Sequence, residues 1–337
     1  MNNRTFWWFV GPSLFMMVLF IAGPLVGVAV QSFQQQRASF ETVERESCTP
    51  FGCTTEEATV PITGDDGRII TRTVWVGWEN YAALLNGPAV RNALANPGDA
   101  LRQLAQIPFW DALRFTVTFA LVTLPLVIVL GLLLALAVNT LTEQLKGPTI
   151  FVTLLPFIIT PVIGALAIRW LFIGDGILTA GLERLLQQEI AMFAQGWTIE
   201  LMMLGYRVWH VVPFAFVIFY AGLQTVASER LEAAGIDGAT RWQKLRHVIV
   251  PHLMPLIVFV SLIHLMDSYR VFDEIVGFSA SGYRISLQWL TYDFLIPDES
   301  GNRSIGRASA SAVLTMIGIV VILIPLLRNT WKEQRQA

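Results

Sequence analysis

The sequence predicts an all-α membrane protein with about six transmembrane helices. Of its 337 residues, 54% are hydrophobic and only 14% are charged, whereas roughly a quarter of the residues of a soluble domain are charged. The apolar residues gather in runs of about 20 or more, the length that a helix needs to cross a hydrocarbon core of about 30 Å. The net charge of −2 argues against a nucleic-acid partner, which requires a dense basic surface.

Six apolar runs divide the chain. Prolines and glycines lie within several of them, which membrane helices tolerate because neighbouring groups satisfy the freed backbone atoms. The first run exceeds the roughly 7–15 apolar residues of a signal peptide, so we interpret it as a retained anchor. The runs are Phe6–Val30, Phe115–Val138, Pro148–Ile173, Ile199–Leu223, His252–Phe278 and Ala308–Leu327.

The positions of the basic residues predict the orientation. With the N-terminus inside, all three lysines, Lys146, Lys244 and Lys332, fall in cytoplasmic pieces, as the positive-inside rule requires. Most arginines on the other side lie in one long loop, and loops beyond about 60 residues cross largely regardless of charge. We therefore expect both termini in the cytoplasm.

Four parts follow from these runs. Residues 1–30 are the start and first span, 31–111 an external loop domain, 112–327 a core of five helices with a cytoplasmic loop at 225–251, and 328–337 a cytoplasmic tail. In the external part, the turn residues Thr63–Gly67 precede a β-branched run, which predicts a hairpin over Ile62–Val76.

The only two cysteines, Cys48 and Cys53, lie close together in this external part. An oxidising compartment favours a local disulfide between them, with free thiols as the alternative. Two cysteines without a nearby histidine do not make a zinc site, and we predict no metal site.

The cytoplasmic loop between the fourth and fifth runs predicts two short helices around a glycine turn. Ser228 is a candidate N-cap of the first helix, and Gly238 can adopt the positive φ of the turn. The second helix is expected over Ala239–Val248, ending before Pro251.

The second short helix exposes Trp242 and Leu245 beside the basic Arg241 and Lys244. A short helix with an apolar ridge and a basic flank suits docking into a groove of another protein. A solvated helix whose Trp242 rests against the bilayer is the alternative.

The pattern of this loop resembles the coupling loop of ATP-binding-cassette (ABC) importer permeases. Glu-Ala-Ala, Asp-Gly-Ala and a basic aromatic stretch precede Pro-x-x-x-Pro, and the version with Trp242 is similar to the carbohydrate permeases of the maltose and glycerol-phosphate type. Gly235 stands where the family usually has a larger residue. The matching residues are Glu232, Ala233, Ala234, Asp237, Gly238, Ala239, Pro251 and Pro255.

The resemblance implies a type I ABC importer permease bundle in a bacterial plasma (inner) membrane. It implies that eight residues couple the chain to two separate ABC ATPase subunits: Glu232, Ala233, Ala234, Asp237, Gly238, Ala239, Trp242 and Leu245. The chain is then no enzyme and needs no cofactor, because ATP and Mg²⁺ are bound by the ATPase; no phosphate-loop motif occurs in the sequence. Further implied partners are a second permease subunit in a heterodimer, an external solute-binding protein, a sugar-like solute and membrane lipid.

Polar residues within the spans indicate a candidate solute pathway, since such residues are costly in lipid and face the bundle interior. We expect the pathway at His264, Asp267 and Ser268, on one face of the fifth span, with Trp209 and Tyr220 opposite. The structural alternatives are that Asp267 pairs with Arg270, and that Arg207, Arg270 and Asp273 approach the outer interface.

Two other classes remain open on the sequence alone. In an ion-coupled secondary transporter, His264 and Asp267 would carry protons. A membrane-embedded enzyme would need a catalytic polar cluster at one membrane face, and the four histidines show no convincing ligand spacing.

Overall fold

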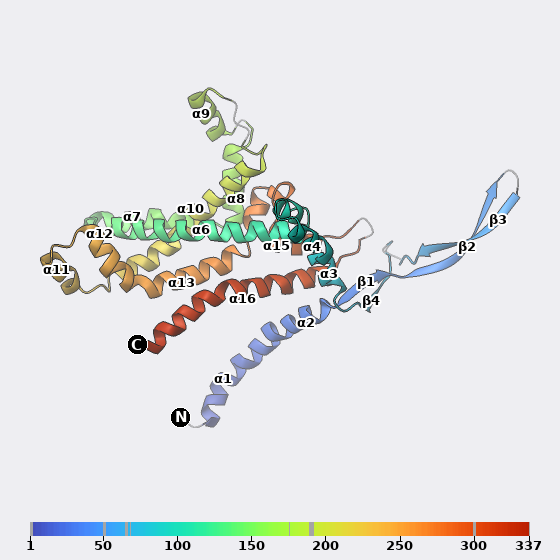
Figure 1. Ribbon diagram of the computed structural model, residues 1–337, viewed down its shortest axis with the longest axis horizontal. Helices are drawn as coiled ribbons and strands as arrows, with labels where there is room; N and C mark the ends of the chain where they lie inside the picture. The colour runs from blue at the N-terminus through green and yellow to red at the C-terminus, as the bar shows by residue number, and fades with distance from the viewer. Residues whose placement is uncertain are drawn as a thin grey trace. The chain divides into compact units, whose positions relative to one another are not determined.

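The computed structural model describes residues 3–49, 52–64, 67, 69–174, 176–188, 192–298 and 301–336. The chain divides into two compact units. The first comprises Met1–Trp110 and Leu290–Ile317, and the second comprises Asp111–Trp289 and Gly318–Ala337. The described residues are mainly helical, with two small sheets in the first unit (Figure 1). This confirms the predicted all-α membrane class.

Five helices of the described part are long and apolar enough to cross a membrane. A sixth candidate is a helix pair, Glu143–Ile158 and Pro161–Phe172, bent by 94° at the break between its two parts. Counted as one span, this pair completes the predicted six. The five are Phe6–Gln31, Pro108–Asn139, Gly196–Leu223, Arg241–Ser268 and Ile305–Pro325.

In the first unit, the first span is followed by a β-ribbon and short helices. Helices α1 and α2 form the span, and the start of α16 returns beside the short helices α3 to α5. The bounds are α1 Asn3–Met17, α2 Gly23–Gln31, β1 Gln34–Ala38, β2 Phe40–Thr49, β3 Gly52–Pro61, β4 Thr71–Trp75, α3 Glu79–Leu85, α4 Gly87–Ala95, α5 Ala100–Leu104 and α16 Ile305–Gln336.

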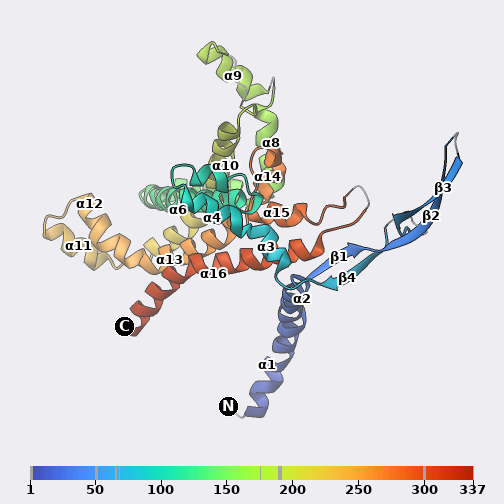
Figure 2. The same cartoon turned by 45° about the vertical axis from the view of Figure 1, so that its right-hand side comes forward.

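The hairpin expected over Ile62–Val76 is not how this ribbon pairs. A single bridge, Thr63 to Ile69, closes the predicted turn, but β4 pairs antiparallel with β1, and β2 with β3 (Figure 2). The described residues between β3 and β4 thus interrupt a longer two-stranded ribbon. The partner strand β1 reads Gln-Gln-Gln-Arg-Ala, a composition with little β-propensity, so the sequence gives no sign of it.

The ribbon places the two cysteines opposite each other. Cys48 and Cys53 are register partners in the pairing of β2 with β3, although their side chains lie outside the described residues. Directly opposed residues have Cβ atoms about 4.5–5.5 Å apart, close to the separation that a disulfide needs. We predict that maleimide labels both thiols only after reduction, and that Cys48→Ser leaves one thiol reactive without reduction. Equal labelling before and after reduction would show free thiols.

The second unit contains the remaining helices, packed around α10. Their bounds are α6 Pro108–Asn139, α7 Glu143–Ile158, α8 Pro161–Phe172, α9 Ile177–Leu186, α10 Gly196–Leu223, α11 Ser228–Ile236, α12 Arg241–Lys244, α13 Val250–Ser268, α14 Asp273–Gly277 and α15 Leu287–Asp293, with α6, α15 and α16 continuing across the unit boundary.

Helix α10 lies at the core of the second unit. Its Phe216 and Phe219 are fully buried in an apolar cluster with Val127 of α6 and Leu253 of α13. Gly131 of α6 permits the close approach, because a Cβ there would lie only 2.7 Å from Ala215 Cβ. Small residues at such contacts are typical of membrane helices.

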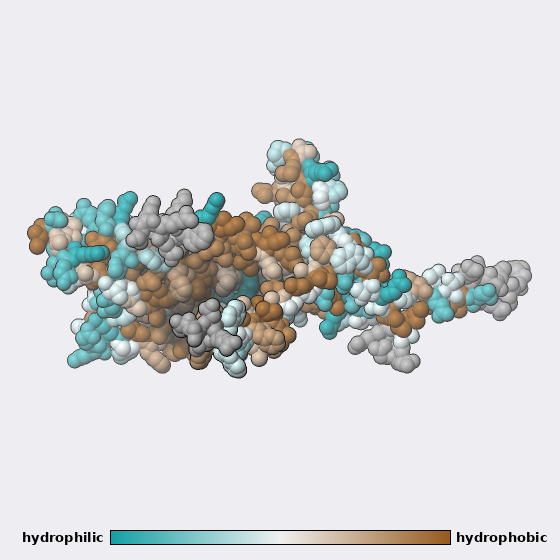
Figure 3. Space-filling model, turned by 90° about the horizontal axis from the view of Figure 1, so that it is seen from below, coloured by the Kyte–Doolittle hydropathy of each residue, from teal (hydrophilic) through white to brown (hydrophobic). Residues whose placement is uncertain are grey.

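Many apolar side chains point away from this core. Leu121, Leu133 and Phe151 are 57%, 52% and 63% exposed, and Figure 3 shows broad apolar surface over the helices. So much exposed apolar area is typical of a lipid-facing surface.

Two π-helical turns each precede a proline. Val18–Ala22 comes before Pro24, and Leu245–Ile249 before Pro251. A proline has no N–H and clashes with the carbonyl four residues earlier, and widening the preceding turn accommodates it. The helix therefore continues through Pro251 into α13, which corrects the predicted end before that residue.

The fifth span ends earlier than its apolar run. Helix α13 stops at Ser268, and the chain turns before α14, whereas the run predicts helix to Phe278. The carbonyl of Val271 in this turn accepts a hydrogen bond of 2.5 Å from Ser286 Oγ. The turn brings carboxylates on both of its sides toward α10.

Candidate functional site

The cytoplasmic loop forms a helix pair, α11 and α12, joined at Gly238. Gly238 has φ of 73°, as the sequence predicts. Its N–H bonds to the carbonyl of Gly235 at 3.1 Å, and the N–H of Ala239 bonds to that of Ala234 at 2.9 Å. These two bonds are those of a Schellman C-cap, which requires a left-handed residue at this position. The Asp-Gly-Ala part of the motif is thus the end of α11.

The start of each short helix differs from the prediction. Ser228 is the first residue of α11 and not its N-cap; the N-cap is Ala227, without a side-chain bond. Helix α12 begins at Arg241, because Thr240 caps it in a reciprocal box with Gln243. Thr-x-x-Gln is a sequence signature of this box and could have placed the boundary.

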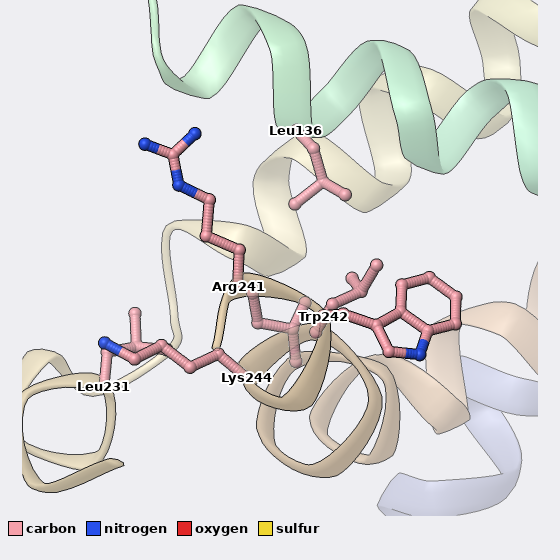
Figure 4. Close-up of a pocket in the computed structure, with 7 residues that line it drawn as sticks. Leu136, Leu231, Arg241, Trp242 and Lys244 are labelled. Atoms are coloured by element: carbon pink, nitrogen blue, oxygen red, sulfur yellow. The ribbon is translucent and has the colours of Figure 1, made fainter. Parts of the chain in front are cut away.

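The helix pair presents apolar side chains to its surroundings. Ile236 is 88% exposed and Trp242 67% exposed. A groove of about 600 Å³ lies beside α12, and its walls come from α6, α11 and α12 with the following π turn (Figure 4). Trp242 and Lys244 lie on opposite sides of α12. The groove residues are Leu136, Leu231, Arg241, Trp242, Lys244, Leu245 and Ile249.

The structure explains why Gly235 stands where the family usually has a larger residue. A Cβ at Gly235 would lie 3.0 Å from Lys244 Nζ, so the glycine leaves room for this ammonium group beside the end of α11. The carbonyls there favour a positive charge. The side chains of Glu232 and Ala233 on α11, and of Asp237 at its C-cap, are exposed.

A charged cluster lies between α10, α13 and α14. Arg207 Nη1 donates to Glu274 Oε1 at 2.8 Å, and Nη2 donates to Asp267. Arg207 is 5% and Glu274 1% exposed, whereas the Asp267 side chain is 52% exposed. Arg207 is therefore buried within the unit, and among the described residues the ion-pair partner of Asp267 is Arg207 and not Arg270.

The sequence gives little sign of this role for Glu274, because the residue lies within the apolar run that predicts a continuous helix to Phe278. Only the turn after Ser268 brings it back to α10. The cluster holds one more carboxylate than guanidinium groups, and Glu274 Oε2 and Arg207 Nε have no partner within the described residues.

The five expected pathway residues do not converge in this structure. His264 and Ser268 are 1% and 0% exposed, and His264 Nε2 lies 2.9 Å from Thr123 Oγ1 and 3.1 Å from Ser268 Oγ. They join α6 to α13 inside the unit and line no open surface. Tyr220 packs beside Phe216, with ring centroids 5.9 Å apart.

Two of the five remain accessible. Trp209 is 44% exposed beside Tyr206, with ring centroids 6.0 Å apart, and Asp267 is the exposed member of the charged cluster. These two side chains are available to a solute or to another subunit.

The break between α7 and α8 is held by side chains of α10. His210 Nε2 lies 2.9 Å from the Ile159 carbonyl, so it donates there, and Tyr206 Oη donates to the Pro161 carbonyl at 2.7 Å. The carbonyl of Ile159, just past the end of α7, is freed at the break and needs such a donor within a membrane, and the bond of Tyr206 ties the start of α8 to α10. These residues therefore have a structural task that the sequence does not reveal.

Replacing His210 tests this task. His210→Leu should destabilise the protein by about 1–3 kcal/mol, the cost of a buried carbonyl without a donor, while His210→Gln, which retains an N–H donor, should recover part of it. Thermal unfolding in detergent measures both. Trp209→Leu on the same helix is the control, because the Trp209 indole holds no carbonyl at the break within the described residues. Equal midpoints of thermal unfolding for His210→Leu and the wild type would contradict the structural role of His210 at the break.

Residues 104–332 match the family described as binding-protein-dependent transport system inner membrane component. The match contains the helix pair, the charged cluster and the broken span. The chain belongs to this family. Its members are transport components and not enzymes, and nothing in the match supports an ion-coupled secondary transporter.

Relatives and solved structures agree with the family. The trehalose transport system permease protein SugA of Mycobacterium tuberculosis is 31% identical over 69% of this chain and 76% of its own length. The trehalose/maltose transport system permease protein MalF of Thermococcus litoralis is 27% identical over 68% and 77%. In fold, the chain is similar to a subunit of a bacterial ABC transporter involved in alginate import, with a TM-score of 0.68, 16% identity and coverage of 98% and 96%.

Proposed function

We propose that this chain is the transmembrane subunit of an ATP-driven importer and moves a sugar or sugar-like solute by alternating access. The proposal rests on the family match across 104–332 and on relatives named for trehalose, maltose, diacetylchitobiose and lactose transport. The names of these relatives support a sugar as the substrate class.

The helix pair carries the coupling part of the proposal. A partner ATPase would receive α12 with Trp242 and Leu245 in a groove, and Arg241 and Lys244 would pair with its surface. In support, Trp242 is 67% exposed and lines an apolar groove beside Arg241 and Lys244, and an apolar patch with a polar rim is typical of a protein–protein contact site. ATP and Mg²⁺ would bind to that partner, and this chain would hydrolyse nothing.

The remaining partners follow from the same assembly. A second permease subunit would complete the pathway beside Trp209 and Asp267, and an external solute-binding protein would deliver the solute. In support, a similar fold occurs in a bacterial alginate ABC transporter solved with its pentasaccharide-bound periplasmic protein, with a TM-score of 0.57 and 20% identity. Both termini, the loop 225–251 and the tail 328–337 would lie in the cytoplasm, and residues 31–111 outside.

Single cysteines test the orientation. In a variant with Cys48→Ser and Cys53→Ser, Glu229→Cys places a thiol on α11 and Arg91→Cys places one on α4; both positions are exposed. An impermeant maleimide applied to intact spheroplasts should label only the Arg91→Cys variant. After the membrane is opened, the same reagent should label both variants. Labelling of Glu229→Cys in sealed spheroplasts would place the helix pair outside and overturn the coupling proposal.

The contact with the ATPase is tested in the same variant without native cysteines, Cys48→Ser and Cys53→Ser. Trp242→Cys should form a cross-link to a co-purifying ATPase subunit, whereas Arg91→Cys should not. Uptake of a labelled disaccharide should stop when ATP is depleted and persist when only the proton gradient is collapsed. Uptake with the opposite dependence, or a folded complex without any ATPase, would contradict the proposal.

A further inference from the structure

Two pockets of the first unit share one arginine. A polar pocket of about 250 Å³ is lined by Gln35, Gln36, Asp298, Asn302 and Arg303 among others, and an apolar pocket of about 300 Å³ by Leu84, Ile107, Phe109, Leu290 and Phe294 among others. Arg307 lines both. We call them the polar and the apolar compartment.

Arg307 lies at the outer boundary of the last span. Residues 308–327 carry no charge, and Arg328 follows them. About 20 residues at roughly 1.5 Å each cover the hydrocarbon thickness of about 30 Å. Since a charged side chain is costly inside that layer, Arg307 and Arg328 mark its two limits along α16.

The apolar compartment lies on the membrane side of Arg307. Its Leu84 and Phe294 belong to one apolar cluster with Ala310, Val313 and Leu314, which follow Arg307 by one to two turns along α16 into the span. The polar compartment is instead lined by strand residues of the external ribbon, Gln35 and Gln36. From outside to inside, the order is polar groups, a guanidinium and an apolar cavity.

The charge of the polar compartment favours an anion. Arg303 and Arg307 make no ion pair within the described residues. Among the described residues that line the pocket, Asp298 is the one carboxylate, and it accepts the N–H of Asn302 at 2.9 Å. These described lining residues thus carry two guanidinium groups and one carboxylate, a net charge of +1. Guanidinium groups bind phosphate oxygens through charge-assisted hydrogen bonds.

We propose that the two compartments bind one phospholipid of the outer leaflet, with its phosphate at Arg303 and Arg307 and an acyl chain entering the apolar compartment. A phosphate joined to an apolar chain reproduces the order of the two compartments. The inference rests on the proposed orientation, in which α16 spans the membrane with its start outside, but it is independent of the transported solute and of the ATPase.

Native mass spectrometry of the full chain, purified in a phosphate-free maltoside detergent, tests the proposal with dioleoyl phosphatidylglycerol as the probe. We expect one tightly held lipid in the wild type and an apparent affinity about tenfold lower in Arg307→Gln. Ala83→Trp should have a similar effect, because Ala83 lines the apolar compartment and is exposed, so the indole fills the cavity without disturbing a core. Arg91→Gln, at an exposed arginine outside both pockets, should bind as the wild type does.

Two fragments of the lipid separate its parts. Diolein has the chains without a phosphate, and glycerol 3-phosphate has the phosphate without chains; each should bind at least about tenfold more weakly than the whole lipid. Equal binding of glycerol 3-phosphate would show an anion pocket and overturn the lipid assignment. Unchanged lipid binding in both Arg307→Gln and Ala83→Trp would overturn the site. Unchanged lipid binding with a loss of affinity for the external binding protein in Arg307→Gln would assign the pocket to that protein.

Discussion

Replacing Gly238 by valine should abolish solute uptake while the protein still inserts and folds. The residue ends α11 with φ of 73°, and a β-branched residue there costs about 1–3 kcal/mol of backbone strain. A Cβ at Gly238 would meet nothing within 4 Å, so the effect is one of backbone conformation and not of a clash. The strain is relieved by reorienting α12, which would remove Trp242 from its docking position.

The measurement is uptake and ATP hydrolysis by the reconstituted complex. Uptake should fall more than about tenfold, which corresponds to 1.4 kcal/mol or more of lost coupling, and hydrolysis should no longer respond to solute. Gly238→Asn is the matched control, because asparagine tolerates the left-handed conformation, and it should keep most of the activity. Equal losses in both variants would indicate that side-chain bulk matters and not φ.

The glycine turn could be predicted because its signal is local. Asp-Gly-Ala after a short helical pattern is sufficient to place a positive φ at Gly238, and the apolar runs are sufficient to locate the spans, although the fifth span, Arg241–Ser268, begins and ends about ten residues before its run. The capping box at Thr240 was also within reach, since it needs only Thr and Gln three residues apart. Local chemistry fixes these features, so no tertiary information was needed.

The charged cluster and the broken span depend on contacts far apart in the sequence. Glu274 reaches Arg207 only because α13 stops at Ser268, and that stop has no strong breaker in its sequence. His210 is polar within a span, which favours a pathway role, but the Ile159 carbonyl that it serves becomes free only through the 94° bend. A single sequence does not contain this geometry.

Arg207 should prove the most sensitive residue of the second unit. Arg207→Met leaves Glu274, which is 1% exposed, without its guanidinium, and breaking a buried ion pair in this way costs about 3–5 kcal/mol. The midpoint of thermal unfolding in detergent should therefore fall steeply. Glu274→Met should cost less, because Arg207 keeps its bond to Asp267.

The double variant decides whether the stability lost in Arg207→Met comes from an unpaired buried charge or from lost packing. With Arg207→Met and Glu274→Met together, no unpaired charge remains buried, because Asp267 is 52% exposed, and apolar replacement of a buried pair is often close to neutral. Most of the stability lost in Arg207→Met should therefore return. A double variant as unstable as Arg207→Met would mean that the guanidinium is needed for its shape. Recovered stability without recovered uptake would show that the cluster has a further task in transport, and Asp267, its exposed member, would be the residue to examine.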